Sequence, residues 1–452
     1  MQPDSGRPGR AGTTETTPAT ADPAATADPA GSAVLGAAEP GRRFAGIPAT
    51  GRAALGCWLA SRLLTLAILA TPAERDIIRD VRYYGNQLGD LFQGTPVTEV
   101  LREYPAPSFA VFVPPRWLAE LTHFTYASVF VALMIAIDAA FTLALWRSGG
   151  RRATPGLRLW LLLVPCLGPL TFTRFDLVSA ALAGAAMLAL AARRPMWSGV
   201  LAAAGASVKL WPAGLLPALL VRRDRPGRVL AGFAGLGAIA VVATLLGGGV
   251  TRLLSPLTWQ GERGLQLETI WAVPLLWGRA VSPDTWSTPY TRFFAFQIEG
   301  PGVAALTRLS TIATVAAVAL LVALSWRAWR ATGPDRRAGL PLVGMLAIAA
   351  ACLLIVPNKT LSPQYLLWLA GLLAALGAVA PDEPLIPRLN VMLVLSCLLT
   401  QILYPLGYGM LTGPDWSNVI GAALLTARNA LLLVITVLAV RRVLELTRRA
   451  PA

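Results

Sequence analysis

The chain alternates between long apolar runs and shorter polar stretches, many of them rich in arginine. Several runs approach or exceed the roughly 20 apolar residues that cross a bilayer as a helix. Inside lipid every backbone polar group must be satisfied internally, so only helix bundles and closed barrels span it. Unbroken apolar runs, without the alternation of barrel strands, favour helices. The predicted spans are 53–71, 124–146, 157–173, 176–192, 228–249, 304–327, 339–357, 363–380, 388–408 and 417–440.

The two ends of the chain depart from this pattern. Residues 1–48 are rich in Ala, Pro and Thr and lack apolar periodicity, which predicts a disordered cytoplasmic tail. Residues 446–452 are predicted to form a short basic cytoplasmic tail. Between them, residues 49–445 are expected to form one membrane-embedded domain.

Arginine clusters orient the predicted spans, because cytoplasmic loops carry an excess of basic residues. This rule places both termini in the cytoplasm and the polar segments 71–123 and 250–303 on the extracytoplasmic face. The apolar stretch 195–220 has basic clusters on both sides but is too short for two crossings. It is therefore expected to form a re-entrant hairpin with its apex near Lys209. The predicted fold is an all-α polytopic membrane protein with about ten full spans, this hairpin and a long first extracytoplasmic loop.

The composition agrees with this class. Of the 452 residues, 55% are hydrophobic and 14% are charged, with a mean hydropathy of +0.57. The net charge of +15 sits in short clusters between apolar runs, so no basic face for nucleic acid is expected. One histidine and four cysteines within apolar runs provide no metal-ligand spacing, and no metal or cofactor is predicted. Only two of the 39 basic residues are lysines, Lys209 and Lys359.

The first extracytoplasmic segment holds the largest polar cluster, reading D-V-R-Y-Y from Asp80 and E-Y-P-A-P from Glu103. A carboxylate flanked by tyrosines suits proton abstraction from a sugar hydroxyl, which needs a positioned base in a site that excludes water. Asp80 is the predicted base, and Tyr83, Tyr84, Glu103 and Tyr104 are predicted to contact substrate. The same residues also fit an interfacial amphipathic loop with its tyrosines in the aromatic belt.

Two further clusters are predicted on the same face. Arg174 and Asp176, in T-R-F-D, either pair with each other in a tight turn or bind sugar hydroxyls. In W-Q-G-E-R-G-L-Q-L-E-T, Arg263 offers a fork for phosphate, while Gln266 and Glu268 offer contacts for sugar hydroxyls. A solvated interfacial helix is the alternative for this second cluster.

A fourth cluster, N-K-T-L-S-P-Q-Y, contains Lys359 and Gln364. The ammonium of Lys359 either neutralises an anionic head group or simply snorkels to the interface. Asp138 lies inside a predicted span, so we expect it to face the bundle and to have a partner that the sequence alone does not identify.

Taken in order, D-V-R-Y-Y with the following G-x-P and E-Y-P, then R-F-D-L, S-V-K-L-W-P, E-R-G-L-Q-L-E and S-P-Q-Y-L-L-W resemble glycosyltransferase family 87. These motifs lie between residues 76 and 368, in the family's order. Two positions depart from the family pattern: Val97 stands where Tyr is usual after Pro96, and Ala106 replaces the second Pro of Y-P-P.

The resemblance implies a GT-C-type helix bundle and transfer from a sugar linked to a polyprenyl monophosphate. The acceptor hydroxyl would lose its proton to Asp80 and attack C1 of the sugar while the lipid phosphate leaves, without a metal. Cations must stabilise the leaving phosphate, and Arg263 and Lys359 are the candidates.

The predicted protein is therefore a multi-pass hexosyltransferase of the cell membrane. It would move a hexose, with mannose as the first choice, from a polyprenyl-phosphate sugar to a glycolipid or cell-envelope glycan on the extracytoplasmic face. Two alternatives stay open. One is an arabinofuranosyltransferase of the same family, and the other is a transporter or flippase of lipid-linked sugars, for which the hairpin and Lys209 are typical features.

Overall fold

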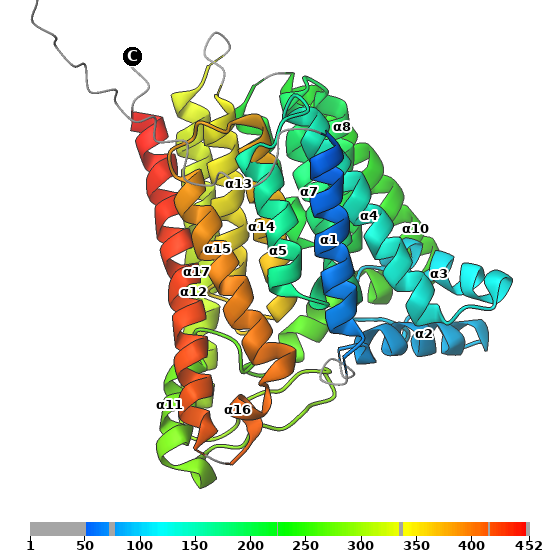
Figure 1. Ribbon diagram of the computed structural model, residues 1–452, viewed down its shortest axis with the longest axis vertical. Helices are drawn as coiled ribbons and strands as arrows, with labels where there is room; N and C mark the ends of the chain where they lie inside the picture. Colours follow the sequence, from blue (N-terminus) through cyan, green and yellow to red (C-terminus); the bar gives the residue numbers. More distant parts are fainter. Residues whose placement is uncertain (1–50, 72–76, 224, 334–337, 415, 449–452) are drawn as a thin grey trace, which may run out of the picture. The chain divides into compact units, whose positions relative to one another are not determined.

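A computed structural model describes residues 51–71, 77–223, 225–333, 338–414 and 416–448. The predicted tail at 1–48 lies outside these residues, and so does most of the predicted tail at 446–452. The described residues belong to one compact unit, Ile47–Ala452. Their regular elements are helices, and isolated β-bridges occur within the segment 266–299. The longer helices run side by side in one bundle (Figure 1).

Every predicted span falls on a helix. Within the described residues, six helices are long and apolar enough to cross a membrane. They are α1 (Gly51–Leu69), α4 (Tyr126–Ser148), α10 (Pro226–Glu262), α12 (Val303–Ala331), α15 (Ile386–Gln401) with its π-helical extension η6 (Ile402–Leu406), and α17 (Ser417–Arg448).

The other four predicted spans fall on shorter helices. Two of these, α13 (Leu340–Ile355) and α14 (Leu366–Val379), are buried along nearly their whole length, because five neighbouring helices pack around them. The neighbouring helices are α5, α7, α12, α15 and α17. The helical membrane class is thus confirmed, whereas the count of ten full spans stays a prediction. The four are α5 (Pro155–Leu167) with α6 (Leu170–Thr173), α7 (Asp176–Ala191), α13 (Leu340–Ile355), and η5 (Pro363–Tyr365) with α14 (Leu366–Val379).

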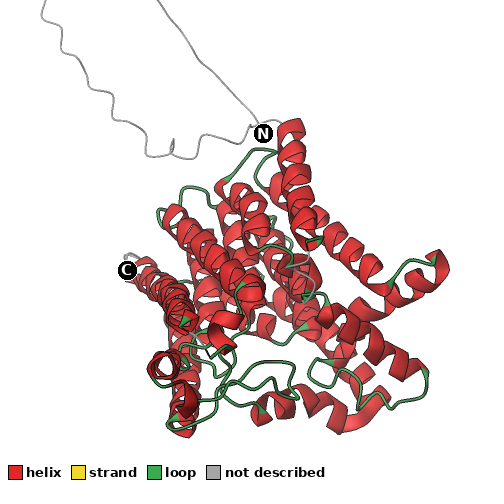
Figure 2. Cartoon of the chain, turned by 60° about the horizontal axis from the view of Figure 1, so that its bottom comes forward, coloured by secondary structure: helices red, strands yellow, loops and turns green. Residues whose placement is uncertain are grey.

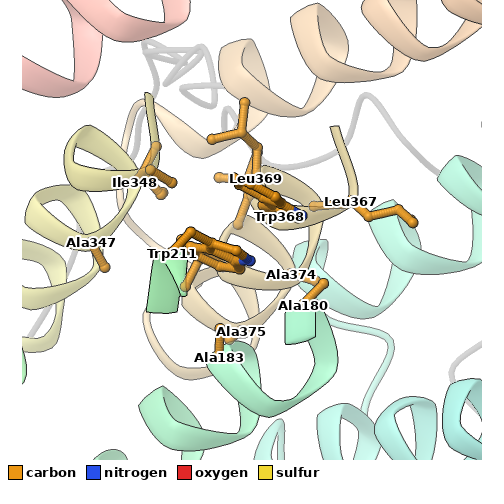
Figure 3. Close-up of a cluster of buried hydrophobic side chains, with 14 of the residues drawn as sticks. Ala180, Ala183, Trp211, Ala347, Ile348, Leu367, Trp368, Leu369, Ala374 and Ala375 are labelled. Carbon is orange, nitrogen blue, oxygen red and sulfur yellow. The ribbon is translucent and has the colours of Figure 1, made fainter. Parts of the chain in front are cut away.

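Small side chains allow the central helices to approach closely. Figure 3 shows alanines of α7, α13 and α14 around the rings of Trp211 and Trp368. The two rings are stacked, with centroids 4.9 Å apart and planes 8° from parallel. In lipid, helix association relies on such close packing, since lipid chains are as apolar as the side chains. This packing fixes the frame on which the polar loops are mounted.

The stretch predicted as a hairpin is a helix followed by a tight return. It comprises α8 (Pro195–Val208), the extended residue Lys209, η3 (Trp211–Leu215) and α9 (Leu216–Val221). At the end of α9, the hydroxyl of Thr332 donates to the carbonyl of Val221 at 3.2 Å, so this arm ends beside the C-terminus of α12.

The first arm of the hairpin starts at the same end of the bundle, since Gly199 on α8 contacts the first turns of α10. The predicted turn at Lys209 is therefore present. Its position relative to a bilayer stays a prediction.

The crossing of α8 and α10 predicts a sharp effect at Gly232. A Cβ at Gly232 would overlap the carbonyl oxygen of Met196, whereas nothing lies within 4 Å of a Cβ at Gly235 on the same helix. We expect Gly232→Ala to lower the unfolding temperature. Gly235→Ala should leave it unchanged or raise it slightly, because Ala favours a helix by about 1 kcal/mol over Gly. Thermal unfolding of both variants in detergent checks this, and equal effects would contradict the close crossing.

A buried charge pair joins α1, α4 and α5. The guanidinium of Arg62 contacts both carboxylate oxygens of Asp138 at 2.8 and 2.6 Å. The indole N–H groups of Trp58 and Trp160 donate to the same carboxylate at 2.7 and 2.8 Å. Asp138 is 0% exposed, so the prediction that it faces the bundle is confirmed and its partner is identified.

In Figure 1 the helices of the predicted extracytoplasmic segments lie at the right (α2 and α3) and at the lower left (α11). The longest loops lie in the lower part of Figure 2. Gly249, at φ 66° and ψ −165°, breaks α10 where the predicted span ends, so residues after it form a separate outer helix. The other elements here are α2 (Arg79–Phe92), η2 (Ala106–Ser108), α3 (Phe109–Thr122), α11 (Val273–Val281), η4 (Pro283–Thr285) and α16 (Gly409–Thr412).

Candidate active site

A cavity of about 690 Å³ lies where these loops meet the helix bundle. Its walls come from the first loop, the outer end of α10, the loop after α10, the apex of the hairpin and η5 with its flanking residues. Most of the predicted site residues line it. Those residues are Asp80, Tyr83, Glu103, Tyr104, Arg174, Arg263, Gln266, Glu268 and Gln364.

Asp80 lies in the first turn of α2, on the cavity wall. Its Oδ2 is 2.9 Å from the Nη2 of Arg174, and its side chain keeps 31% of its surface exposed. Burial raises the pKa of the Asp80 carboxyl above its usual value, while the charges of Arg174 and Lys209 oppose that rise. A carboxylate with a raised pKa that still faces a cavity is suited to accept a proton.

Arg174 is held from several sides. Its Nη1 donates to the backbone carbonyls of Ile77 and Thr173 at 3.1 and 3.2 Å, and its Nη2 donates to the hydroxyl of Tyr404 at 2.9 Å. The side chain is only 4% exposed. These contacts anchor Ile77, two residues before α2, and fix the guanidinium beside Asp80.

The idea that Arg174 and Asp176 pair with each other is wrong, because each has a different partner. Arg174 pairs with Asp80. Asp176 is fully buried, and each of its carboxylate oxygens accepts a hydrogen bond from the Lys209 ammonium at 2.7 Å. Asp176 does not line the cavity, although Lys209 does.

Tyr83, Glu103 and Tyr104 form a further part of the wall. The Tyr83 hydroxyl donates to Oε1 of Glu103 at 2.9 Å, while the buried Oε2 has no partner within the described residues. Burial raises the pKa of Glu103. Arg252 on the outer helix donates to the carbonyls of Leu101 and Tyr104 at 3.2 and 2.9 Å, which holds this loop in place.

Tyr84 belongs to the core and does not line the cavity. It is 1% exposed, and its ring packs against Phe112, Phe130 and Phe175 with centroids 4.8 to 5.8 Å apart. On an α-helix, neighbouring residues point about 100° apart, so Tyr83 faces the cavity while Tyr84 faces the bundle.

The loop after α10 contributes two polar groups with different environments. Gln266 donates from Nε2 to the hydroxyl of Ser362 at 3.3 Å, and its buried Oε1 has no partner in the part of the chain described. The carboxylate of Glu268, in contrast, accepts from Arg428 at 2.9 Å and from the Tyr408 hydroxyl at 3.4 Å. Glu268 thus ties the loop to α17, and Gln266 retains an open acceptor.

The two cations proposed for phosphate also differ. Arg263 lines the cavity, its buried Nε has no hydrogen-bond partner, and no ion pair joins it to another described residue. Lys359 lies outside the lining and donates to the carbonyl of Gly261 at 2.8 Å. Burial and the nearby Arg263 lower the pKa of Lys359.

Several lining residues were not predicted from the sequence. Lys209 was expected at the apex of the hairpin but was not assigned to the site. The aromatic lining comes from elements far apart in sequence, and no local motif marks it. These residues include Tyr290, Phe293, Phe296, Tyr365, Trp368, Tyr404 and Tyr408. Within the described residues, no three His, Cys, Asp and Glu side chains are grouped to hold a metal ion.

The fold is a helical membrane bundle with a polar and aromatic cavity at one end. The sequence model of glycosyltransferase family 87 matches residues 103–357, which is more than half of the chain. The chain belongs to glycosyltransferase family 87, so it is a membrane glycosyltransferase, an enzyme of the transferase class. The match covers Glu103, Arg174, Lys209 and Arg263, while Asp80 precedes it. No curated protein matches the sequence.

Proposed function

We propose that this glycosyltransferase moves a hexose, mannose in the first instance, from a polyprenyl-monophosphate sugar to a glycolipid or cell-envelope glycan. The observation that carries the proposal is that a carboxylate and a cation line the same cavity. Asp80 faces the cavity beside a fixed Arg174, and the same cavity holds Arg263, for which the described residues provide no ionic partner. A base and an uncommitted cation are what transfer from a phosphate-linked sugar requires.

The chemistry proceeds in one displacement. The acceptor hydroxyl gives its proton to the Asp80 carboxylate, and its oxygen forms a bond to C1 of the donor sugar. The bond between C1 and the phosphate oxygen breaks, and its electron pair leaves with the lipid monophosphate. Arg263 binds the phosphate, while Tyr83, Glu103 and Gln266 hold sugar hydroxyls. The configuration at C1 inverts, because attack and departure occur on opposite faces.

A lipid-borne donor is supported by the apolar part of the lining. Leu210 and Leu257 line the cavity, and their side chains are 45% and 59% exposed. An apolar rim beside a polar chamber suits a substrate with a hydrocarbon tail and a charged head. The bundle has no loop domain at its other end within the described residues that could bind a nucleotide sugar.

The proposed topology has about ten spans and the hairpin, with both termini in the cytoplasm and the cavity outside, as the arginine clusters favour. A single cysteine introduced at Asp284, in η4, on a cysteine-free background should react with an impermeant thiol reagent on intact cells. Reaction only after permeabilisation would contradict the orientation.

Removing the charge of Arg263 should weaken donor use. A hydrogen bond to a charged group is worth about 1.5–3 kcal/mol, so Arg263→Gln should raise the donor KM or lower kcat/KM by about 10- to 100-fold. Arg292→Gln in the same predicted extracytoplasmic segment is the control, because Arg292 pairs with the exposed Glu262 at 3.1 Å and does not line the cavity. Steady-state assays with varied donor check this, and equal losses in both variants would count against a phosphate contact.

The pH dependence of kcat/KM should reflect the ionisation of the Asp80 carboxyl. The base must be deprotonated, and burial raises its pKa above the ordinary 3.8. Activity should therefore fall as the pH drops through a value above 3.8, and should be retained at higher pH. The acidic limb of kcat/KM measures this, and it should persist in Glu103→Gln, whose carboxyl pKa is also raised. A limb that disappears in Glu103→Gln would transfer the base role to Glu103.

The donor is tested with the purified full-length protein in nanodiscs. Polyprenyl-phosphate-mannose and its arabinofuranose counterpart are each offered with several glycolipid acceptors. We expect label from the mannose donor in the extracted glycolipid. If only the arabinofuranose donor gives labelled glycolipid, the transferred sugar is a pentose and the proposed hexose is wrong. The reaction class would be unchanged.

A further inference from the structure

Lys209 is held at the cavity wall more firmly than a lysine usually is. Its ammonium lies 2.7 Å from each carboxylate oxygen of Asp176, and the indole N–H of Trp368 donates to the same carboxylate at 2.8 Å. The side chain of Lys209 is 16% exposed, and that of Asp176 is 1% exposed. The lysine thus reaches the cavity, while its anionic partner stays behind the wall.

Aromatic rings enclose the same ammonium. The Nζ of Lys209 lies 4.8 Å from the ring centre of Phe175, 5.5 Å from that of Tyr365 and 5.7 Å from that of Trp368. The Trp368 ring is itself fixed by stacking on Trp211 (Figure 3) and on Tyr365. Rings at this distance attract a cation, and together with Asp176 they restrict where the ammonium can lie.

This arrangement is poorly explained by stability alone. A buried ion pair costs several kcal/mol in desolvation per ion, roughly what its attraction returns, so apolar replacements are often no less stable. Ionisable groups buried inside the helix bundle of a membrane protein are a mark of function. The backbone of Lys209 is extended and separates α8 from η3. Its side chain therefore lies at the apex of the hairpin.

We propose that Lys209 is the second cation that binds the phosphate of the lipid donor, with Asp176 and Trp368 as positioning residues. This inference rests on the proposed function. Lys209 has three N–H donors, of which Asp176 engages two, and the third is available to a phosphate oxygen. Lys359, the other lysine, is bound to the carbonyl of Gly261 outside the cavity lining.

The reaction itself explains why a second cation is needed. The donor is a phosphodiester with one negative charge. When the bond to C1 breaks, its electron pair stays on the phosphate oxygen, and the leaving lipid monophosphate carries close to two charges at neutral pH. A fixed ammonium therefore gains attraction as the reaction proceeds, and it lowers the barrier more than it tightens donor binding.

The test compares a charged lipid with its uncharged match. The probes are farnesyl phosphate and farnesol, bound to the full-length protein in nanodiscs and measured by isothermal calorimetry. The variant is the double substitution Lys209→Gln with Asp176→Asn, which removes both charges together and leaves no unpaired buried ion. We expect its affinity for farnesyl phosphate to fall by about 10- to 100-fold, with farnesol binding unchanged.

Two further variants sharpen the result. Lys359→Gln should bind farnesyl phosphate like the wild type. Lys209→Arg, which keeps the charge, should retain most of the preference for the phosphate, and kcat should fall more than donor KM rises in the double variant. A purely structural role for Lys209 would instead weaken both probes equally.

The outcomes separate the two proposals. If the wild type transfers sugar and prefers farnesyl phosphate, but the double variant keeps that preference, the role of Lys209 is overturned and the proposed function stands. If the wild type neither prefers the phosphate nor uses a polyprenyl-phosphate donor, both fail.

Discussion

Replacing Asp80 by Asn should reduce sugar transfer by about 10²- to 10⁴-fold, the usual contribution of a general base. Asparagine has the same shape and can still accept a hydrogen bond from Arg174, which lies 2.9 Å from Oδ2. It cannot take the proton of the acceptor hydroxyl. We therefore expect the loss in kcat, with little change in donor affinity, in a steady-state assay of the purified protein.

Asp90→Asn provides the matched control. Asp90 lies on the same helix, α2, and is exposed at its far end. This variant should transfer sugar at the wild-type rate. Normal transfer by Asp80→Asn would remove Asp80 as the base and make Glu103, which lines the same cavity, the next candidate.

Replacing Arg62 by Ala should destabilise the protein by about 3–5 kcal/mol, the cost of leaving one member of a buried ion pair alone. Asp138 would keep only the indole donors of Trp58 and Trp160 in a site with no exposure to solvent. Thermal or denaturant unfolding in detergent should show a clear loss of stability.

An exposed pair supplies the comparison. Arg116 and Glu120 lie one turn apart on α3, 2.8 Å apart, with side chains 35% and 57% exposed. Exposed pairs of this kind contribute about 0.2–1 kcal/mol, so Arg116→Ala should change little. The double variant Arg62→Met with Asp138→Leu should recover most of the lost stability, since it leaves no buried charge. If Arg62→Ala unfolds like the wild type, the pair is not the link between α1 and α4.

The helices and the hairpin were predictable because they depend on composition over many residues. Apolar length predicted a helix at each of these positions, and the charge on both sides of 195–220 predicted that the chain returns near Lys209. The break in α10 at Gly249 also falls at the predicted end of a span. Properties that are averaged over many residues do not depend on which residue a particular side chain contacts.

The partners within the site were not predictable, because they depend on contacts between distant elements. Arg174 and Asp176 are two residues apart, yet one pairs with Asp80 and the other with Lys209. Glu268 is engaged by Arg428 from α17, 160 positions away. No local spacing encodes these distances.

One feature of the first loop was readable and was missed. The buried residues of α2 are Val81, Tyr84, Gly85 and Leu88, the spacing of one face of an amphipathic helix. Treating the segment as a loop put Tyr83 and Tyr84 together in the site. The helical period separates them, and it leaves Asp80 and Tyr83 on the face that lines the cavity.

The central claim is that the sugar arrives on a polyprenyl monophosphate. The most direct measurement gives the purified protein either polyprenyl-phosphate-[¹⁴C]mannose or GDP-[¹⁴C]mannose and counts label in the extracted glycolipid. The account predicts label from the lipid donor and none from the nucleotide sugar. Label from GDP-mannose alone, in preparations free of polyprenyl phosphate, would contradict it.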